Sequence, residues 1–302
     1  MASAVYGAPP PALVTIPDDA RQVSPLVPGA IALEDLPDAS LDSIAVAAPP
    51  GAIERRYALA LALRALKAGG ALTAVAPKDK GGMRLRRELE SFGCAVSEQS
   101  LRHQRLCTCV RPEAPTGLEQ AIAEGAPQMV PRLGLMSQPG VFSWDRPDPG
   151  SVTLARHLAG LAGEGVDLGC GVGVLAPAVL ASPKVTALTL VDIDRRAVDA
   201  ARRNVADPRA RFLQADLREP FPSLPNLDFV VMNPPFHDTG EEDRGLGQAF
   251  IRRAAAMLRR GGVLRLVANI GLPYEATLAD AFDQARRLEQ GGGYKVLEGR
   301  RI

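Results

Sequence analysis

The sequence contains few cysteine, histidine and aromatic residues and almost no net charge. Its 302 residues include 4 cysteines and 3 histidines, and aromatic residues make up 4%. So little cysteine argues against a disulfide framework and fits a reducing cytoplasm. The spacing of the four thiols is not that of paired zinc ligands, so we expect no metal. The formal net charge of +1 provides no global field that would mark a nucleic-acid partner.

Long apolar runs are also lacking. Residues 1–11 show no basic segment followed by an apolar core, so we predict no signal peptide. No apolar run approaches the ~20 residues that span a bilayer, which argues against a transmembrane helix. With 46% hydrophobic and 23% charged residues the composition is typical of a globular protein, and the length suffices for two domains. We therefore expect a cytoplasmic protein of two domains.

Proline content and strand patterns divide the chain into four parts. Residues 1–20 are rich in proline and alanine and are expected to be loose. A first domain is expected over 21–112, a linker over 113–132 and a second domain over 133–302. In the second domain the patterns predict strands and helices in alternation: strands at 165–168, 187–192, 210–214, 227–232 and 263–268, and helices at 151–162, 172–181, 195–205, 246–259 and 274–281. This alternation predicts an α/β, Rossmann-like fold with a seven-stranded sheet, which ends in an antiparallel hairpin within 284–302.

The two halves resemble each other. DSIAVAAPP at 42–50 parallels DFVVMNPP at 228–235, and each stretch is followed by a helix and a strand that begins with Gly-Gly. In this alignment Ala48 stands where the second half has Asn233. Chance likeness between two βα units is the alternative, but repeated units favour duplication. We interpret the first half as a degenerate copy that kept the architecture and lost the chemistry.

Asn233-Pro234-Pro235-Phe236 is the most informative stretch, because it ends an apolar strand abruptly. Two prolines stop the strand and cannot start a helix at once, so they hold the Asn side chain and nearby carbonyls in a fixed arrangement. Carbonyl oxygens can accept the N–H bonds of a planar amine, and the aromatic ring can stack on its face. A plain strand-to-loop turn is the alternative interpretation.

A glycine-rich turn, Asp167-Leu168-Gly169-Cys170-Gly171-Val172-Gly173, follows the first strand of the second domain. Glycines there permit a tight turn and a close approach of ligand to backbone. A carboxylate as near as Asp167 disfavours a pyrophosphate and favours a ligand with an ammonium group. S-adenosylmethionine has such a group and no phosphate, so we predict it as the cofactor and hold a dinucleotide as the weaker alternative.

Two further strand ends supply acids. Asp192, followed by Ile193, ends the second strand and can accept both ribose hydroxyls, while Asp194 is expected to cap the next helix. Asp216 ends the third strand and can accept from the adenine amine, with Leu217 against the ring; a turn acid is the alternative. Because carboxyl ends of parallel strands share one edge of a sheet, these groups and Asn233 predict a single crevice.

Taken together, these motifs resemble the class I S-adenosylmethionine-dependent amino-methyltransferases. Three stretches are similar to the bacterial small-subunit (16S) ribosomal RNA guanine-N2 methyltransferases of the C type: Pro139–Ser143 with Asp148 and Gly150-Ser151, Asn233–Asp238, and Leu264–Asn269 with Leu272-Pro273-Tyr274. The likeness covers 133–302 and is faint over 1–112, where that family also carries a degenerate copy of the fold. The large-subunit (23S) enzymes share this layout. Trp144-Asp145-Arg146, in the loop expected to line the base pocket, departs from the family pattern.

The resemblance implies methyl transfer to the exocyclic N2 of a guanine in 16S ribosomal RNA. Asn233 and the Pro234 carbonyl would accept the two N–H bonds of the amine, and Phe236 would stack on a flipped-out base. The other expected substrate contacts are Phe142, Trp144, Pro235 and His237; core packing is the alternative for Phe142, and an ordinary loop histidine for His237. A protein-glutamine methyltransferase and a non-enzymatic binding module are the competing functions. The first usually carries a helical N-terminal domain, and the intact site residues argue against the second.

Contacts to RNA are expected from the first half, at Lys78, Lys80, Arg84, Arg86 and Arg87. Arg84 and Arg87 are three residues apart and share one face of a helix. A solvated charged face is the alternative interpretation. We expect a monomer that acts on ribosomal RNA within the 30S subunit.

Overall fold

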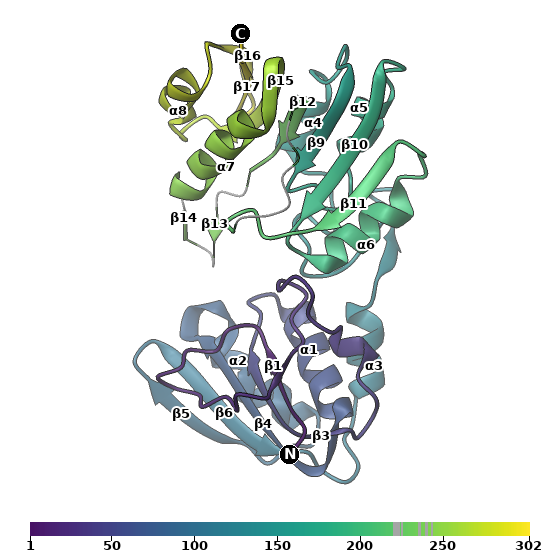
Figure 1. Cartoon of the computed structure of the whole chain (residues 1–302). Helices are drawn as coiled ribbons and strands as arrows, with labels where there is room; N and C mark the ends of the chain where they lie inside the picture. The colour runs from purple at the N-terminus through teal and green to yellow at the C-terminus, as the bar shows by residue number, and fades with distance from the viewer. Residues whose placement is uncertain (220–223, 225, 235–236, 239–240, 243) are drawn as a thin grey trace. The chain divides into compact units, whose positions relative to one another are not determined.

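The chain forms two compact units, each with its own sheet (Figure 1). The computed structural model describes residues 1–219, 224, 226–234, 237–238, 241–242 and 244–302. Unit 1 comprises Met1–Gln128 with Gln138–Gly140, and unit 2 comprises Met129–Ser137 with Val141–Ile302. The expected architecture, two Rossmann-like units of which the second carries the intact motifs, is confirmed.

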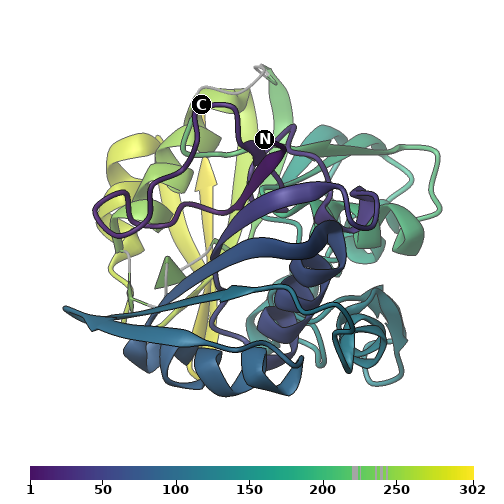
Figure 2. The same ribbon diagram turned by 90° about the horizontal axis from the view of Figure 1, so that it is seen from below.

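Unit 1 is built on a six-stranded sheet of order β2-β1-β3-β4-β6-β5 among the described residues, and its strands can be followed in Figure 2. β1, β2, β3 and β4 pair in parallel, and β6 and β5 add an antiparallel hairpin. The elements are β1 Ser3–Tyr6, β2 Arg21–Gln22, the 3-10 turn Leu33–Asp35, β3 Leu41–Ala47, α1 Ala52–Ala65, β4 Leu66–Pro77, the π-helical turn Lys78–Gly82, α2 Met83–Ser91, β5 Ser97–Leu101, β6 Gln104–Val110 and α3 Leu118–Gly125.

Two segments of unit 1 are more ordered than the sequence predicted. Within 1–20, expected to be loose, β1 is fully buried and pairs with both β2 and β3. Within 113–132, expected to be a linker, α3 packs on α1. The approach is so close that a Cβ on Gly125 would lie 2.4 Å from the Cβ of Tyr57. Short apolar stretches beside prolines look like coil in a sequence, because only burial against a partner stabilises them.

Unit 2 contains a seven-stranded sheet of order β11-β10-β9-β12-β15-β17-β16 among the described residues. The strands pair in parallel as far as β15, and β17 and β16 form the predicted antiparallel hairpin. The elements are β7 Gln128–Val130, β8 Leu135–Ser137, α4 Pro149–Ala155, β9 Gly163–Leu168, α5 Ala176–Leu180, β10 Val185–Asp192, α6 Arg195–Asn204, β11 Ala210–Gln214, β12 Leu227–Met232, β13 His237–Asp238, β14 Glu241–Glu242, α7 Arg244–Met257, β15 Leu258–Asn269, α8 Tyr274–Ala281, β16 Gln284–Gly291 and β17 Tyr294–Arg300.

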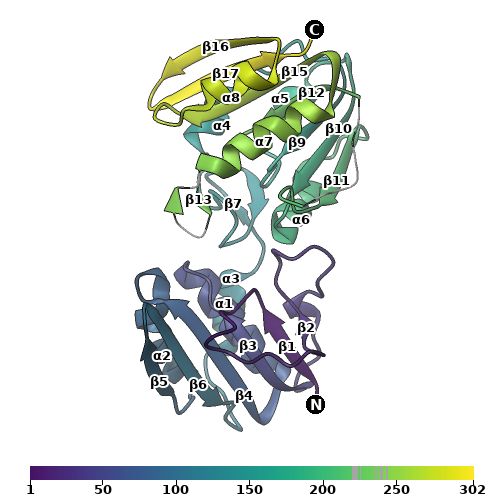
Figure 3. The same ribbon diagram turned by 60° about the vertical axis from the view of Figure 1, so that its left-hand side comes forward.

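Alternating side chains bury both faces of this sheet. On one face Val166, Leu168 and Met232 pack with residues of α7 and α8, which lie side by side in Figure 3. On the other face Leu190 and Val231 pack with residues of α4, α5 and α6. Strands buried on both faces are near-continuous apolar runs, which is why the sequence located them well. α5 is shorter than predicted because Gly171 and Gly173, with φ of +53° and +85°, hold the first part of the predicted helix in a turn.

Three details recur in the two sheets and support the duplication. A Cβ on Gly70 would lie 2.9 Å from the Lys67 carbonyl oxygen, and a Cβ on Gly262 would lie 2.9 Å from that of Arg259. Asp42 pairs with Lys67 as Asp228 pairs with Arg259. Backbone bonds join Gly69 and Gly70 to Arg111, and the same pair of bonds joins Gly261 and Gly262 to Arg301. One of these details is a side-chain pair and two are backbone contacts, and all three favour duplication over a chance likeness of two βα units.

Candidate active site

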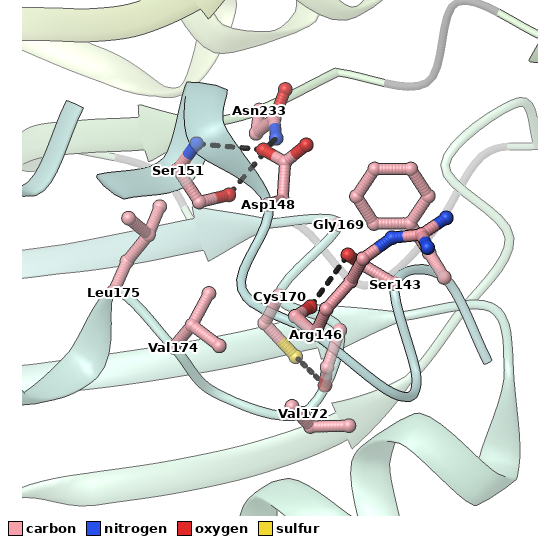
Figure 4. A pocket seen from close by; sticks show the side chains of 12 residues that line it. Ser143, Arg146, Asp148, Ser151, Gly169, Cys170, Val172, Val174, Leu175 and Asn233 are labelled. Atoms are coloured by element: carbon pink, nitrogen blue, oxygen red, sulfur yellow. Dashed lines mark hydrogen bonds between the residues drawn. The ribbon is translucent and has the colours of Figure 1, made fainter. Parts of the chain in front are cut away.

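A pocket at the carboxyl edge of the unit 2 sheet brings several predicted residues together (Figure 4). The loop before α4 contributes Phe142, Ser143 and Arg146, and the start of α4 contributes Asp148 and Ser151. The remaining lining comes from the glycine-rich turn after β9 and from the end of β12: Gly169, Cys170, Gly171, Val172, Val174, Leu175 and Asn233. The crevice expected from the strand ends therefore joins the glycine-rich turn to Asn233.

The glycine-rich turn is held open by backbone geometry and by Asp192. Gly169, Gly171 and Gly173 all have positive φ, and a Cβ on Gly171 would meet no atom within 4 Å. Asp192 Oδ2 accepts a 2.8 Å bond from the Gly171 amide, and its Oδ1 accepts one of 2.9 Å from the Asp194 amide. Burial raises the pKa of Asp192 to about 6, although the bonds from backbone amides oppose the shift.

Asp167 is a fully buried carboxyl that has no hydrogen-bond partner among the described residues. Its side chain is 0% exposed, and neither oxygen accepts a hydrogen bond within the part of the chain that the structure describes. Its neighbours across the sheet are Leu190 and Val231, both apolar. Burial, with the charge of Asp192 second, raises its pKa to about 8. A buried acid with two free oxygens is the observation that fits a cationic ligand group, since such a group would replace the lost hydration.

The third strand end lies apart from the pocket lining. Asp216 pairs with Arg218 at 2.9 Å, and this hydrogen-bonded pair lowers the pKa of Asp216. Leu217 is buried, and the backbone of Ile193 is fixed by a 3.0 Å bond from Gln214 Nε2 to its carbonyl. Asp216, Leu217 and Ile193, like Asp167, Asp192 and Gly173, are not among the residues that line the pocket. Their contact with a cofactor stays a prediction.

Asn233 is oriented by the residues that begin α4. Its Nδ2 donates to Asp148 Oδ2 at 2.8 Å and to Ser151 Oγ at 2.9 Å. Asp148 also caps α4, since the same Oδ2 accepts a 2.7 Å bond from the Ser151 amide. Asp148 and Ser151 belong to the stretches that resemble the family, but their sequence pattern predicts no role for either at Asn233. Asp148 directly before Pro149 is a helix-start signal that would have predicted the cap, but not the contact with Asn233.

The aromatic residues expected at the base pocket occupy different places. Phe142 lines the pocket and is 60% exposed, so it is not a core residue. Trp144 is instead packed against the cluster of Val141, Val172 and Ala197 and does not line the pocket. Pro234 is buried next to Asn233. Pro235, Phe236 and the side chain of His237 lie outside the described residues, so their predicted contacts stay predictions.

Comparison with known proteins gives the family. The family model for the methyltransferase small domain matches residues 132–298. Ribosomal RNA small subunit methyltransferase C of Pseudomonas paraeruginosa is 34% identical over 265 residues, which cover 86% of this chain and 79% of that protein. The Pseudomonas putida KT2440 protein of the same name is 30% identical, with coverage of 88% and 81%.

The chain belongs to the ribosomal RNA small subunit methyltransferase C family. Among solved structures, the T. thermophilus 16S rRNA N2 guanine methyltransferase (RsmC), in complex with AdoMet and guanosine, matches with a TM-score of 0.80 and 25% identity. The match covers 100% of this chain and 88% of that one. The resemblance predicted from the motifs is therefore confirmed.

The RNA contacts predicted for this methyltransferase lie in unit 1. Arg84 and Arg87 are exposed on α2 and, with Arg56 of α1, line a second pocket. Arg56 lies over the Phe92 ring at 5.0 Å, whereas Arg84 and Arg87 have no ion-pair or hydrogen-bond partner among the described residues. Lys78 and Lys80 precede α2 and do not line this pocket.

The described residues contain no cluster of three or more His, Cys, Asp or Glu side chains that could hold a metal ion. They also contain no helix that is long and apolar enough to cross a membrane.

Proposed function

We propose that this methyltransferase transfers a methyl group from S-adenosylmethionine to the exocyclic N2 amine of a guanine in 16S ribosomal RNA. The observation that carries the proposal is the pocket that joins the glycine-rich turn to Asn233. A methyl donor on the turn and an amine held by Asn233 would meet within one crevice. The similar T. thermophilus structure, which contains AdoMet and guanosine, supports this pairing of ligands.

The residues around the glycine-rich turn suit the parts of the cofactor. Bound S-adenosylmethionine would supply an electrophilic methyl group on its sulfonium. Asp167, when ionised, would pair with its ammonium group, because neither carboxylate oxygen has a partner within the described structure. Asp192 would accept the ribose hydroxyls with the lone pairs that the two backbone amides leave free. Asp216 and Leu217, with Gly169, Cys170 and Gly173, complete the proposed cofactor contacts.

Asn233 and Pro234 would position the amine rather than deprotonate it. The lone pair of a guanine N2 is delocalised into the ring, so the free amine is a weak nucleophile. The Asn233 Oδ1 and the Pro234 carbonyl would accept its two N–H bonds and turn the lone pair toward the methyl group. As the new N–C bond forms and the C–S bond breaks, the nitrogen becomes acidic and releases one proton. No strong base is needed, and positioning carries most of the barrier reduction. Phe236 would stack on the base, with Pro235, His237 and Phe142 nearby.

Replacement of Asn233 tests the proposal. Asn233→Ala should still bind S-adenosylmethionine, because the glycine-rich turn is unchanged, while turnover falls by about 10³-fold. Labelled cofactor is incubated with separate 30S, 50S and release-factor substrates, and the 30S RNA is then digested to locate the label. Label in N2-methylguanine of 16S RNA supports the proposal. Label in 23S RNA or in a protein glutamine, or near-normal turnover of Asn233→Ala, would contradict it.

We also infer that the protein docks ribosomal RNA through unit 1 and acts as a cytoplasmic monomer on the 30S subunit. Arg84 and Arg87, together with Lys78 and Lys80, are the proposed phosphate contacts. Arg56 adds a third cation to the same pocket. Glu88 in that pocket is already paired with Arg55, so its charge is compensated. A groove with uncompensated guanidinium groups suits the RNA backbone.

A further inference from the structure

Asn233 is locked in one of its two amide orientations. The oxygen and nitrogen of an Asn side chain are nearly equal in shape, and the hydrogen-bond partners decide which is which. An ionised carboxylate can only accept, so the group of Asn233 that faces Asp148 is its Nδ2. Both N–H bonds of Nδ2 are taken, by Asp148 Oδ2 at 2.8 Å and Ser151 Oγ at 2.9 Å. The amide oxygen consequently points away from both residues, as Figure 4 shows.

Asp148 is itself held in place from several sides. Its Oδ2 accepts the Ser151 amide at 2.7 Å, and its carbonyl accepts the Val152 amide at 3.0 Å. A Cβ on Gly150 would lie 2.9 Å from Tyr294 Cε1 and 3.1 Å from Asp148 Oδ2, so only glycine lets the ring lie beside the carboxylate. Asp148 and Ser151 thus form a clamp on Asn233. It joins the start of α4 to the end of β12, and Tyr294 at the start of β17 lies beside it.

We propose that Asp148 and Ser151 are positioning residues that make Asn233 present a hydrogen-bond acceptor, and so select an amine rather than a carbonyl edge of the target base. This inference rests on the proposed function. If the amide were reversed, its N–H groups would face the N–H groups of the amine, and a base with an oxo group would fit instead. The clamp also strengthens the acceptor, because donation from Nδ2 to a carboxylate places more negative charge on Oδ1.

Asp148 both caps α4 and orients Asn233, and the test separates these two roles. Serine is as good an N-cap as aspartate, so Asp148→Ser keeps the start of α4 and removes the carboxylate from Asn233. Its kcat should fall by about 100-fold, since a small misplacement of a catalytic group costs that much. Its Kd for S-adenosylmethionine should stay within about twofold of the original value. Asp148→Asn keeps both a cap and an acceptor oxygen, so its kcat should exceed that of Asp148→Ser.

A double-mutant cycle then shows whether Asp148 acts through Asn233. In the Asn233→Ala background, Asp148→Ser should cause no further loss of kcat, because there is no amide left to orient. Ser151→Ala removes the other acceptor of Asn233 Nδ2 and should also lower kcat. In the Asn233→Ala background it should have no such effect on kcat. Additive losses, or kcat of Asp148→Ser near that of the unchanged protein, would overturn the inference. If the unchanged protein does not label guanine N2 in 16S RNA, the proposed function fails, and the cycle is run on the amine that is labelled.

Discussion

At the residue scale, burial of the Asp167 carboxyl destabilises the ligand-free protein. The same carboxyl is proposed to pair with the ammonium group of the bound cofactor. Its pKa of about 8, against an ordinary value of 3.8, means that the folded ligand-free protein holds a proton that the unfolded chain has lost between these pH values. The contribution of Asp167 to the free energy of unfolding of the ligand-free protein therefore decreases as pH rises from about 4 to 8. Binding of an ammonium group depends on pH in the opposite direction. It should strengthen as pH rises, because the pair needs the ionised carboxylate.

S-adenosylmethionine should consequently bind more tightly at higher pH. Between pH 6 and 8 the affinity should rise by up to about tenfold per unit as Asp167 ionises. Calorimetry in buffers of different ionisation enthalpy measures the affinity and the proton released on binding. Asp167→Asn is the control and should bind weakly with no such dependence. An affinity of the unchanged protein that is flat from pH 7 to 8 would contradict the pairing.

At the element scale, a buried ion pair ties α1 to α2 in unit 1. Arg55 Nε lies 2.7 Å from Glu88 Oε2, with the Arg55 side chain 1% exposed. The same guanidinium donates to the Pro49 and Pro50 carbonyls at 3.0 and 2.7 Å. These are the prolines that correspond to the Asn-Pro-Pro motif of unit 2. The guanidinium thus occupies the Pro49 carbonyl, whose counterpart in unit 2, the Pro234 carbonyl, is proposed to accept from the amine.

Breaking that pair should destabilise unit 1 strongly. Glu88→Gln leaves a buried guanidinium without its counter-charge and should lower the free energy of unfolding by about 3–5 kcal/mol. Glu90→Gln is a matched control on the same helix. It breaks an exposed 2.8 Å pair with Arg86, and its cost should stay below about 1 kcal/mol. Hydrogen exchange of the α1 and α2 amides reports on unit 1 separately. Equal protection of these amides against exchange in Glu88→Gln and Glu90→Gln would refute the stabilising role of the Arg55–Glu88 pair.

At the scale of the whole molecule, the two sheets share an architecture and differ in chemistry. Gln22 is the last residue of β2, just as Asp192 is the last residue of β10. The Gly7 amide donates to Gln22 Oε1 at 3.1 Å, and the Gly171 amide donates to Asp192 Oδ2 in the same way. Gln22 Nε2 also donates to the Gly7 carbonyl at 2.9 Å, so its side chain is occupied by the unit's own backbone. With an amide in place of the acid and Ala48 in place of Asn233, unit 1 lacks the groups that would hold a cofactor or an amine.

One cofactor should therefore bind per chain. Titration calorimetry should give a single site, and Asp192→Ala should abolish it, because the ribose acceptor is lost. Gln22→Ala is the matched control and should leave the stoichiometry unchanged. A second binding event, or one that survives Asp192→Ala, would show that unit 1 retains a site.

The phosphate contacts proposed for unit 1 are tested by charge reversal. Arg84→Glu with Arg87→Glu should weaken binding of 16S RNA and flatten its dependence on salt, since fewer counterions are released. Arg86→Glu is the control, because Arg86 is already paired with Glu90. Cofactor binding should be unaffected in the double variant and in the control. Unchanged RNA affinity in the double variant would remove these residues from the interface.

The sequence by itself determined the α/β fold, the strands of unit 2 and the meeting of the glycine-rich turn with Asn233. Doubly buried parallel strands are plain apolar runs, and their carboxyl ends share one edge whatever the details of packing. It also located Ala48 at the position in the first half that corresponds to Asn233.

Only the tertiary structure decided that β1 and α3 are ordered, that Trp144 packs away from the pocket, and that Asp148 with Ser151 holds Asn233. These outcomes depend on contacts between residues far apart in the chain. Asp148 and Asn233 are separated by 85 positions, and no local pattern of hydrophobicity or spacing records which side chains meet across that distance. The orientation of the Asn233 amide is a property of its partners, so it exists only once the chain has folded.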